Sequence, residues 1–111
     1  MRVIMYAGTR LMTGDEIADA VLEYCAALAE VGTAETVEIP VLTDEGVRAS
    51  ARLLVGPASQ IVAEDVETSF DELVDSDVVS LLRSRTQSHR PVAASMPRDA
   101  DDSESAWIDD Y

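Results

Sequence analysis

Two alternating segments joined by a short turn constrain this chain more than any other feature of its sequence. Residues 35–42 and residues 47–55 each alternate between two kinds of side chain with a period of two. This period is typical of half-buried β-strands, because successive side chains of a strand point to opposite faces. The segment Thr43-Asp44-Glu45-Gly46 between them is typical of a hairpin turn. The sequence therefore predicts a β-hairpin over residues 35–55.

The register of this hairpin follows from matching the apolar faces of its two strands. A four-residue loop would place Val41 opposite Arg48 and would mix apolar and charged faces. A three-residue loop of residues 44–46 keeps these faces apart and puts Gly46 in the left-handed bulge position. The facing pairs are then Val37–Leu53, Ile39–Ala51 and Val41–Ala49 on one face and Glu38–Arg52 on the other. We therefore predict the three-residue loop.

Neighbouring segments place this hairpin within a larger sheet. Pro40 has no amide hydrogen to donate to a ladder, so the strand at 35–42 is expected at an edge or next to one. The dipeptide Gly56-Pro57 ends the strand at 47–55, and alternation resumes over residues 59–66. This predicts a further strand that extends the hairpin into a meander. At the start of the chain, the apolar run Val3–Tyr6 predicts a first strand.

Residues 14–31 carry the clearest helical pattern in the chain. Five apolar residues recur at spacings of four and three and therefore share one face: Ile17, Val21, Tyr24, Leu28 and Val31. Thr13 and Glu16 have the spacing of a capping box, in which each side chain accepts the amide of the other residue. Gly32 follows the last apolar residue, where a left-handed C-cap belongs. These signals predict a helix from residue 14 to residue 31.

Helical periodicity returns after residue 69, but the start of this second helix has two interpretations. The apolar positions are Phe70, Leu73, Val74, Val78, Leu81 and Leu82. Ser69 and Glu72 have capping-box spacing, whereas Ser76 is an alternative cap for a shorter helix that begins at Asp77. The periodicity stops at about Thr86, so a helix that ends near this residue is expected in either case.

The order of these elements defines the expected fold class. The order β-α-β-β-β-α predicts a small two-layer α+β domain over residues 1–86, with a mostly antiparallel sheet and both helices on one face. The first strand, the first helix and the second strand are expected to form a right-handed crossover unit. Residues 87–111 hold two of the four prolines and six acidic residues. This composition predicts a disordered acidic C-terminal tail, because it buries too little apolar surface to offset the entropy of ordering.

The charge of the chain excludes some classes of partner. Its 111 residues include 22 acidic and 8 basic ones, which gives a net charge of −14. Such a surface repels phosphate backbones and anionic lipids, so we expect no nucleic acid and no membrane as a partner. We expect a protein partner, and a basic surface is the electrostatically favoured kind. No apolar run approaches the roughly 20 residues of a membrane span and no signal-peptide pattern is seen, so the expected location is cytoplasmic.

Few side chains in the sequence offer chemistry. His89 is the only histidine and lies at the start of the expected tail, where we interpret it as a solvated linker residue. Cys25 is the only cysteine, and its position beside the apolar helix stripe is typical of a small buried hydrophobe. One cysteine and one histidine do not supply the four ligands of a structural zinc site in a monomer. We expect no catalytic residue, no cofactor and no metal.

Two groups of residues remain as candidates for binding. Trp107, Ile108 and Tyr111 form an apolar aromatic patch among acids, which is typical of a segment that folds on a protein partner. Arg10, which precedes the first helix, and Ser59 and Gln60, in the loop after Gly56-Pro57, are candidates for contact with a ligand.

The sequence favours a non-enzymatic protein-interaction or accessory module that self-associates, as a homodimer, through a sheet edge or the outer sheet face. The alternative is a small-ligand-binding domain or small enzyme with a pocket between helix 14–31 and the sheet. A packed helix–sheet interface with an apolar patch exposed outside would favour the first function, whereas convergent polar groups in a pocket would favour the second.

Overall fold

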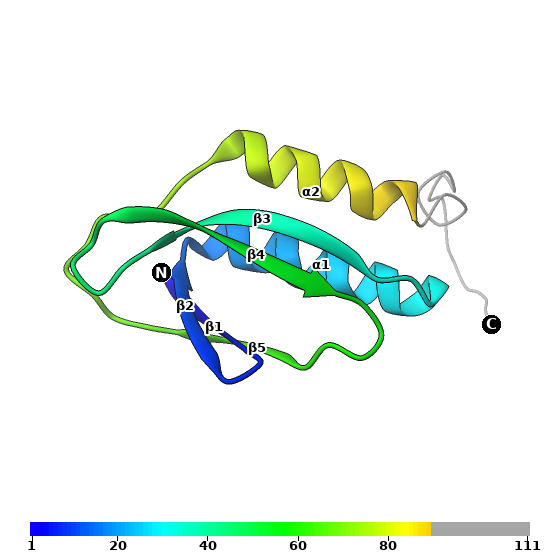
Figure 1. Ribbon diagram of the computed structural model, residues 1–111. Helices are drawn as coiled ribbons and strands as arrows, with labels where there is room; N and C mark the ends of the chain where they lie inside the picture. The colour runs from blue at the N-terminus through cyan, green and yellow to red at the C-terminus, as the bar shows by residue number, and fades with distance from the viewer. Residues whose placement is uncertain (90–111) are drawn as a thin grey trace, which may run out of the picture.

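The computed structural model describes residues 1–89, which form a five-stranded antiparallel sheet and two helices (Figure 1). In chain order the elements are β1 (Arg2–Tyr6), β2 (Thr9–Thr13), α1 (Asp15–Val31), β3 (Glu35–Leu42), β4 (Arg48–Val55), β5 (Ile61–Asp65) and α2 (Ser76–Ser88). The predicted fold class, a small α+β domain with an antiparallel sheet, is confirmed, and the predicted order is found with one strand added. Residues 90–111, which make up most of the predicted tail, lie outside the described residues. Neither helix in the described part is long and apolar enough to cross a membrane.

The added strand is β2, which forms a tight hairpin with β1. Ala7 (φ 51°) and Gly8 (φ 81°) both have positive φ, as a two-residue type I′ turn requires. The two strands then pair along their whole length, from Tyr6 opposite Thr9 to Arg2 opposite Thr13. Sequence reasoning missed this strand, since residues 9–13 show little alternation between polar and apolar side chains.

The capping box predicted at the start of α1 is wrong. Thr13 is the last residue of β2, and its hydroxyl donates to the carbonyl of Pro40 in β3 at 2.7 Å. The N-cap residue is Gly14, which makes no side-chain cap. The amide of Asp15 donates instead to the Glu72 carboxylate at 2.6 Å. The start of α1 is therefore held by contacts with distant segments and not by a local cap.

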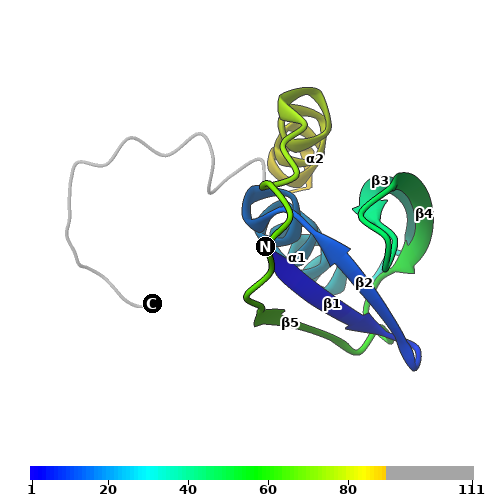
Figure 2. The ribbon, with the colours of Figure 1, turned by 90° about the vertical axis from the view of Figure 1, so that its left-hand side faces the viewer.

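The strand order in the sheet is β4-β3-β2-β1-β5. The predicted crossover unit is wrong, because β2 lies between β1 and β3 and every neighbouring pair is antiparallel. The predicted meander is wrong in its last step, since β5 pairs with β1, so that β4 and β5 form opposite edges. Figure 2 shows that the β3–β4 hairpin curls away from the other three strands, with α1 inside the curl. This curl allows a short loop to carry the chain from one edge of the sheet to the other.

The β3–β4 hairpin has the predicted register. The pairs Val37–Leu53, Ile39–Ala51, Val41–Ala49 and Glu38–Arg52 all face each other. The Thr43 amide donates to the Val47 carbonyl at 2.9 Å, and Gly46 has a φ of 81° at the bulge. β3 is second from the edge, in agreement with the prediction from Pro40.

α2 follows the shorter of its two predicted forms. The helix begins at Ser76, and its N-cap is Asp75, whose carboxylate accepts a hydrogen bond from the Val78 amide at 3.2 Å. The longer helix from Ser69 is wrong, because residues 66–75 form neither helix nor strand. Leu73 in this segment is buried against the core. Its apolar side chain therefore reflects contact with the core and not a place on a helix face.

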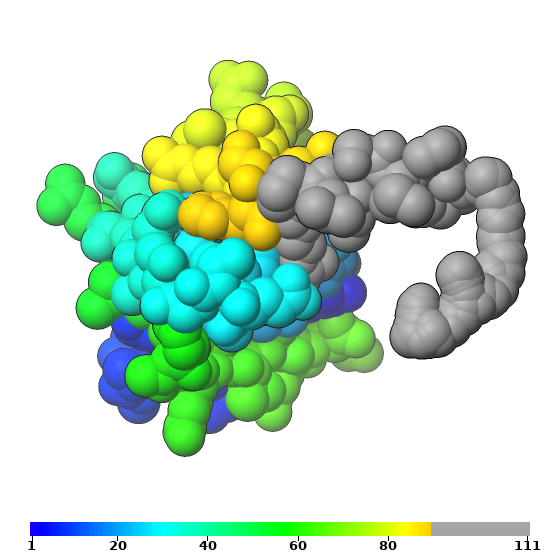
Figure 3. All heavy atoms as spheres, turned by 90° about the vertical axis from the view of Figure 1, so that its right-hand side faces the viewer, coloured from blue at the N-terminus to red at the C-terminus, as the bar shows by residue number. Residues whose placement is uncertain are grey.

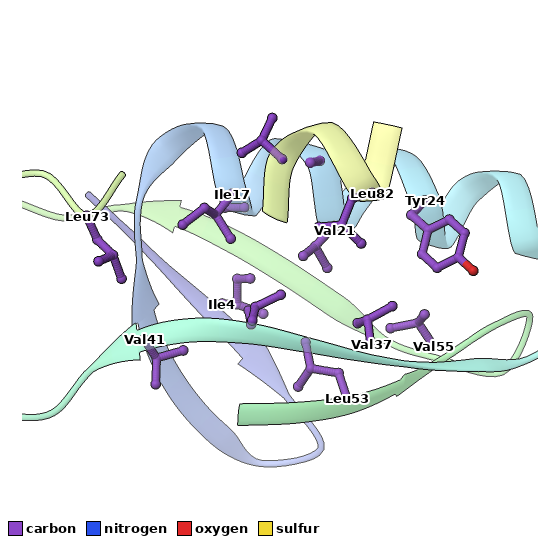
Figure 4. Close-up of a cluster of buried hydrophobic side chains, with 14 of the residues drawn as sticks. Ile4, Ile17, Val21, Tyr24, Val37, Val41, Leu53, Val55, Leu73 and Leu82 are labelled. Carbon is purple, nitrogen blue, oxygen red and sulfur yellow. The ribbon is translucent and has the colours of Figure 1, made fainter. Parts of the chain in front are cut away.

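The core lies between α1 and the concave side of the sheet (Figure 4). On α1 its largest members are Ile17, Val21, Tyr24 and Leu28, which are buried as their spacing predicts. They pack with strand residues that include Ile4, Ile39, Leu53 and Val55. Val31 is instead 48% exposed, because it lies in the last turn beside the left-handed Gly32 (φ 72°), which ends the helix as predicted. Figure 3 shows α2, in yellow and orange, stacked against the cyan end of α1.

Candidate functional site

Three exposed apolar side chains gather on the outer face of the sheet, opposite α1. They are Met5 on β1, Leu54 on β4 and Val62 on β5, which are 38%, 57% and 54% exposed. Met5 and Val62 are directly opposite each other in the β1–β5 ladder and therefore share a face. We call Met5, Leu54 and Val62 the outer apolar patch. An exposed apolar patch is the feature that we expected to favour an interaction module, but sequence reasoning did not place these three residues together.

Tyr6 brings Leu54 to this patch from the far edge of the sheet. The Tyr6 hydroxyl donates to the Leu54 carbonyl at 2.6 Å and accepts from the Leu54 amide at 3.1 Å. In an antiparallel pair, the residues that do not bond the neighbouring strand point their amide and carbonyl outward. Leu54 is such a residue on the edge strand β4. The Tyr6 hydroxyl therefore supplies the hydrogen-bond partner that a neighbouring strand would otherwise give to its amide and carbonyl. The contact ties β1 to β4 although β2 and β3 lie between them in the sheet.

A hollow of about 650 Å³ adjoins the outer apolar patch, and the loop of residues 56–60 forms one of its walls. Ser59 and Gln60, two of the three residues predicted to contact a ligand, both line it. The Ser59 hydroxyl, however, accepts from the Gly56 amide at 3.0 Å and donates to the Leu54 carbonyl at 3.2 Å. These hydrogen bonds close the loop, so the hydroxyl serves the loop conformation.

Arg10 does not line this hollow. It is exposed on β2, directly opposite Met5 in the β1–β2 ladder, and therefore lies on the outer face beside the patch. Val62, Met5 and Arg10 thus form a row across three strands. Of the three predicted contact residues, the structure brings Ser59 and Gln60 together in the hollow and places Arg10 on the patch border.

A second hollow, of about 610 Å³, lies between α2 and the β3–β4 hairpin. Its walls carry three arginines, Arg48 and Arg52 from β4 and Arg85 from α2, together with Glu38 and Asp75. Val78 and the half-exposed Leu81 add apolar surface from the helix. We call this hollow the arginine groove. Sequence reasoning did not find it, because its arginines come from segments more than thirty residues apart.

Asp75 joins the two sides of the arginine groove. Besides capping α2, its carboxylate accepts a hydrogen bond from the Arg48 guanidinium at 2.6 Å. The pKa of Asp75 is lowered from its ordinary value, mainly because the carboxylate accepts the Val78 amide and also because Arg48 lies beside it. Partial burial acts in the opposite direction. The carboxylate therefore remains charged at neutral pH and holds the start of α2 against β4.

His89 is not a solvated linker residue, which corrects our interpretation of the sequence. It forms the C-cap of α2, with its ring centroid 5.9 Å from that of Tyr24 and its Nε2 atom 3.4 Å from Glu35 Oε2. The buried Tyr24 hydroxyl donates to the same Glu35 carboxylate. The three side chains connect the end of α2 with α1 and β3, so their evident role is to hold α2 in place.

The N-terminal amine of the chain lies beside two carboxylates near the start of α1. The Met1 amine is 3.0 Å from Asp15 Oδ1 and 3.0 Å from Glu72 Oε1. The hydrogen bonds that it donates to Glu72 and Asp15 raise the pKa of this amine above its ordinary value, against the opposing effect of burial. Arg2 extends the cluster to Asp65 on β5 at 3.0 Å. These acids thus have structural partners.

Cys25 is half-buried at the side of the core, and its Sγ atom lies 3.9 Å from the Gly56 carbonyl. Among residues 1–89, no group of three His, Cys, Asp or Glu side chains is placed so that it could hold a metal ion. Trp107, Ile108 and Tyr111, the predicted partner-binding residues, lie outside the described residues. Comparison with protein-family models, curated proteins and solved structures finds no match to this chain.

Proposed function

We propose that this chain is a cytoplasmic, non-enzymatic protein-interaction module that self-associates as a homodimer through the outer apolar patch. The observation that carries the proposal is the position of Met5, Leu54 and Val62. Three large apolar side chains, each more than a third exposed, lie together on one sheet face. Single exposed apolar residues are ordinary, whereas a contiguous group is typical of an interaction surface.

The packing of the interior supports the same choice. Ile17, Val21 and Tyr24 fill the space between α1 and the sheet and are at most 1% exposed. The alternative function, a small-ligand-binding domain or small enzyme, needs a pocket between α1 and the sheet. These side chains fill that space, so the packing does not support the alternative. No residue of α1 lines either of the two hollows described above, so both lie away from the interface between α1 and the sheet, which favours a surface function.

The border of the patch suits a second copy of the same chain. Arg10 on β2 and Glu64 on β5 lie on the outer face at opposite sides of Met5. In a two-fold pairing of this face, each Arg10 approaches Glu64 of the second copy. A stable interface buries roughly 800 Å² on each subunit, so the patch forms the centre and these charged residues form the rim. For a different protein as partner, the net charge of −14 favours a basic surface.

Sedimentation equilibrium of the full chain and two aspartate variants tests this function. Val62→Asp places a charge within the patch and should convert a dimer into a monomer. Val74→Asp is the matched control, because Val74 is 64% exposed in the segment before α2, away from the patch. Circular dichroism verifies that both variants fold. A wild-type chain that remains monomeric at high concentration would refute self-association, and a dimer that Val62→Asp leaves intact would refute this surface.

A further inference from the structure

We infer that residues 99–104 of this chain bind its own arginine groove, so that the acidic C-terminal segment is an intramolecular ligand of α2 and β4. This inference goes beyond the proposed function, because it concerns a different surface and a contact within one chain. It rests on the charges of the groove, on the position where the described chain ends, and on the sequence that follows.

The groove concentrates positive charge in an acidic domain. Residues 1–89 contain six arginines and sixteen acidic residues, a net charge of −10. Three of these six arginines line the one groove, against two carboxylates. Asp75 is already paired with Arg48, which leaves Arg52 and Arg85 against the single carboxylate of Glu38. The groove is therefore a favourable place on this surface for an anionic segment.

Two of the arginines have donors to spare. Within the described part of the chain, the guanidinium groups of Arg52 and Arg85 make no hydrogen bond and no ion pair. A guanidinium presents five N–H donors in a plane that matches a carboxylate. Val78 and Leu81 lie beside them and reduce the contact of this part of the groove with water. A carboxylate that enters the groove therefore meets uncommitted donors next to an apolar wall.

The following sequence has the matching charge. Residues 99–104 read Asp-Ala-Asp-Asp-Ser-Glu, with four acids in six positions and no basic residue. Outside the groove, the net negative charge of the domain repels this acidic segment. Among the described residues, the other cations are Met1, Arg2 and Arg83, which already face carboxylates, and Arg10, which is a single exposed charge outside the groove.

The geometry of the chain allows the contact. Arg85 lies in the last turn of α2, only a few residues before residue 90, where the C-terminal segment starts. The helix has 13 residues, and at 1.5 Å per residue it is roughly 20 Å long. Residues 90–98 can extend to roughly 30 Å, so residues 99–104 can reach any point along the helix. A tether of this length gives an effective concentration of about 1 mM, so a weak contact is sufficient for binding.

The arginine side chains themselves report this contact by NMR. The chain has eight arginines and no lysine, so the Nε–Hε region of a ¹⁵N spectrum is simple. The test compares the full-length wild type with a full-length variant that carries Asp99→Asn, Asp101→Asn, Asp102→Asn and Glu104→Gln. We expect the Nε–Hε signals of Arg52 and Arg85 to shift between the two proteins. Arg10 is the internal control, because it is exposed and unpaired in the described residues but lies outside the groove.

Two conditions sharpen the result. In 1 M NaCl, where the Debye length falls to about 3 Å, the shifts of Arg52 and Arg85 should disappear. They should not change on dilution, because the ligand belongs to the same chain. In the reciprocal experiment, Arg52→Gln with Arg85→Gln should shift the amide signals of residues 99–104, and Arg83→Gln, on the same helix but outside the groove, should not.

Three outcomes would overturn the inference. Unchanged signals for Arg52 and Arg85 would show that the segment does not bind the groove. An equal shift for Arg10 would show a general effect of net charge. A shift that grows with protein concentration would show that the segment binds a second copy. Since none of these variants alters the outer apolar patch, loss of this contact would leave the proposed dimer intact.

Discussion

Replacement of Gly46 by alanine tests the bulge that sets the register of the β3–β4 hairpin. Gly46 has a φ of 81°, a conformation that costs a residue with a Cβ atom roughly 1–2 kcal/mol. A Cβ at this position would also lie 2.7 Å from Phe70 Cε1, so the ring must move. Phe70 belongs to the 66–75 segment, which carries the chain towards α2. We expect Gly46→Ala to lower the free energy of unfolding by about 2–3 kcal/mol, of which the backbone accounts for the larger part.

Urea denaturation followed by circular dichroism measures this loss. Gly8→Ala is the matched control, because Gly8 also has a φ of 81° but has no atom within 4 Å of the Cβ position. It should lose only the backbone contribution of roughly 1–2 kcal/mol. A Gly46→Ala variant as stable as the wild type would refute the bulge and with it the register. A loss no larger than that of Gly8→Ala would refute the steric contact with Phe70.

Three further predictions concern contacts between distant parts of the chain. Asp75→Ala removes the cap of α2 and the partner of Arg48, so its urea midpoint should fall. Because the pKa of Asp75 is lowered in the folded state, the advantage of the wild type over this variant should be complete above the ordinary pKa of 3.8 and should be lost as the pH falls through the folded-state pKa. A stability difference that stays constant with pH would contradict this role. The raised pKa of the Met1 amine has the opposite sign: its contribution is complete below pH 8.0 and is lost as the pH rises through the folded-state pKa. Acetylation of this amine should therefore lower the melting temperature at pH 7 and abolish the alkaline decrease, and an unchanged pH profile would argue against the ion pairs. Tyr6→Phe should cost about 1 kcal/mol in the same urea assay, since the Leu54 amide and carbonyl lose their partner; equal stability would contradict the link between β1 and β4.

Patterns in the sequence predicted those elements whose decisive contacts are local. The hairpin register depends on two adjacent strands and the loop between them, so alternation alone selects it. The end of α1 depends on Gly32, which adopts the left-handed conformation within the same turn. Both predictions are confirmed because no distant segment competes for the groups involved.

Elements whose contacts are distant could not be predicted in this way. Thr13 and Glu16 have the spacing of a capping box, yet the Thr13 hydroxyl bonds the Pro40 carbonyl 27 residues later. The sequence pattern does not contain this competitor. The position of β5 depends in the same way on the curl of the sheet, which lets Ile61 and Ala63 pack against the core from the β1 edge. A strand that alternates correctly can therefore be assigned to the wrong neighbour.

The residues of the two candidate surfaces could not be grouped from the sequence for the same reason. Met5, Leu54 and Val62 are each isolated in the sequence, and only the strand order brings them together. Leu54 did carry a local signal, because it is the one apolar residue on a strand face that otherwise holds Arg48, Ser50 and Arg52. An exposed apolar residue at the end of a polar row indicates that the surface around that end of the strand is apolar.

The outer face of β4 contributes to both surfaces. Its polar part, with Arg48 and Arg52, lines the arginine groove, whereas Leu54 at its end belongs to the outer apolar patch. The change occurs over two residues: α2 runs along the hairpin, from Asp75 beside Arg48 to His89 beside Glu35, whereas Leu54 is held to β1 by the Tyr6 hydroxyl. One eight-residue strand therefore separates a surface suited to an acidic ligand from a surface suited to an apolar one. Since β4 is an edge strand held at one end by Asp75 and at the other by Tyr6, loss of either contact should loosen the strand at that end and disturb the adjoining surface first.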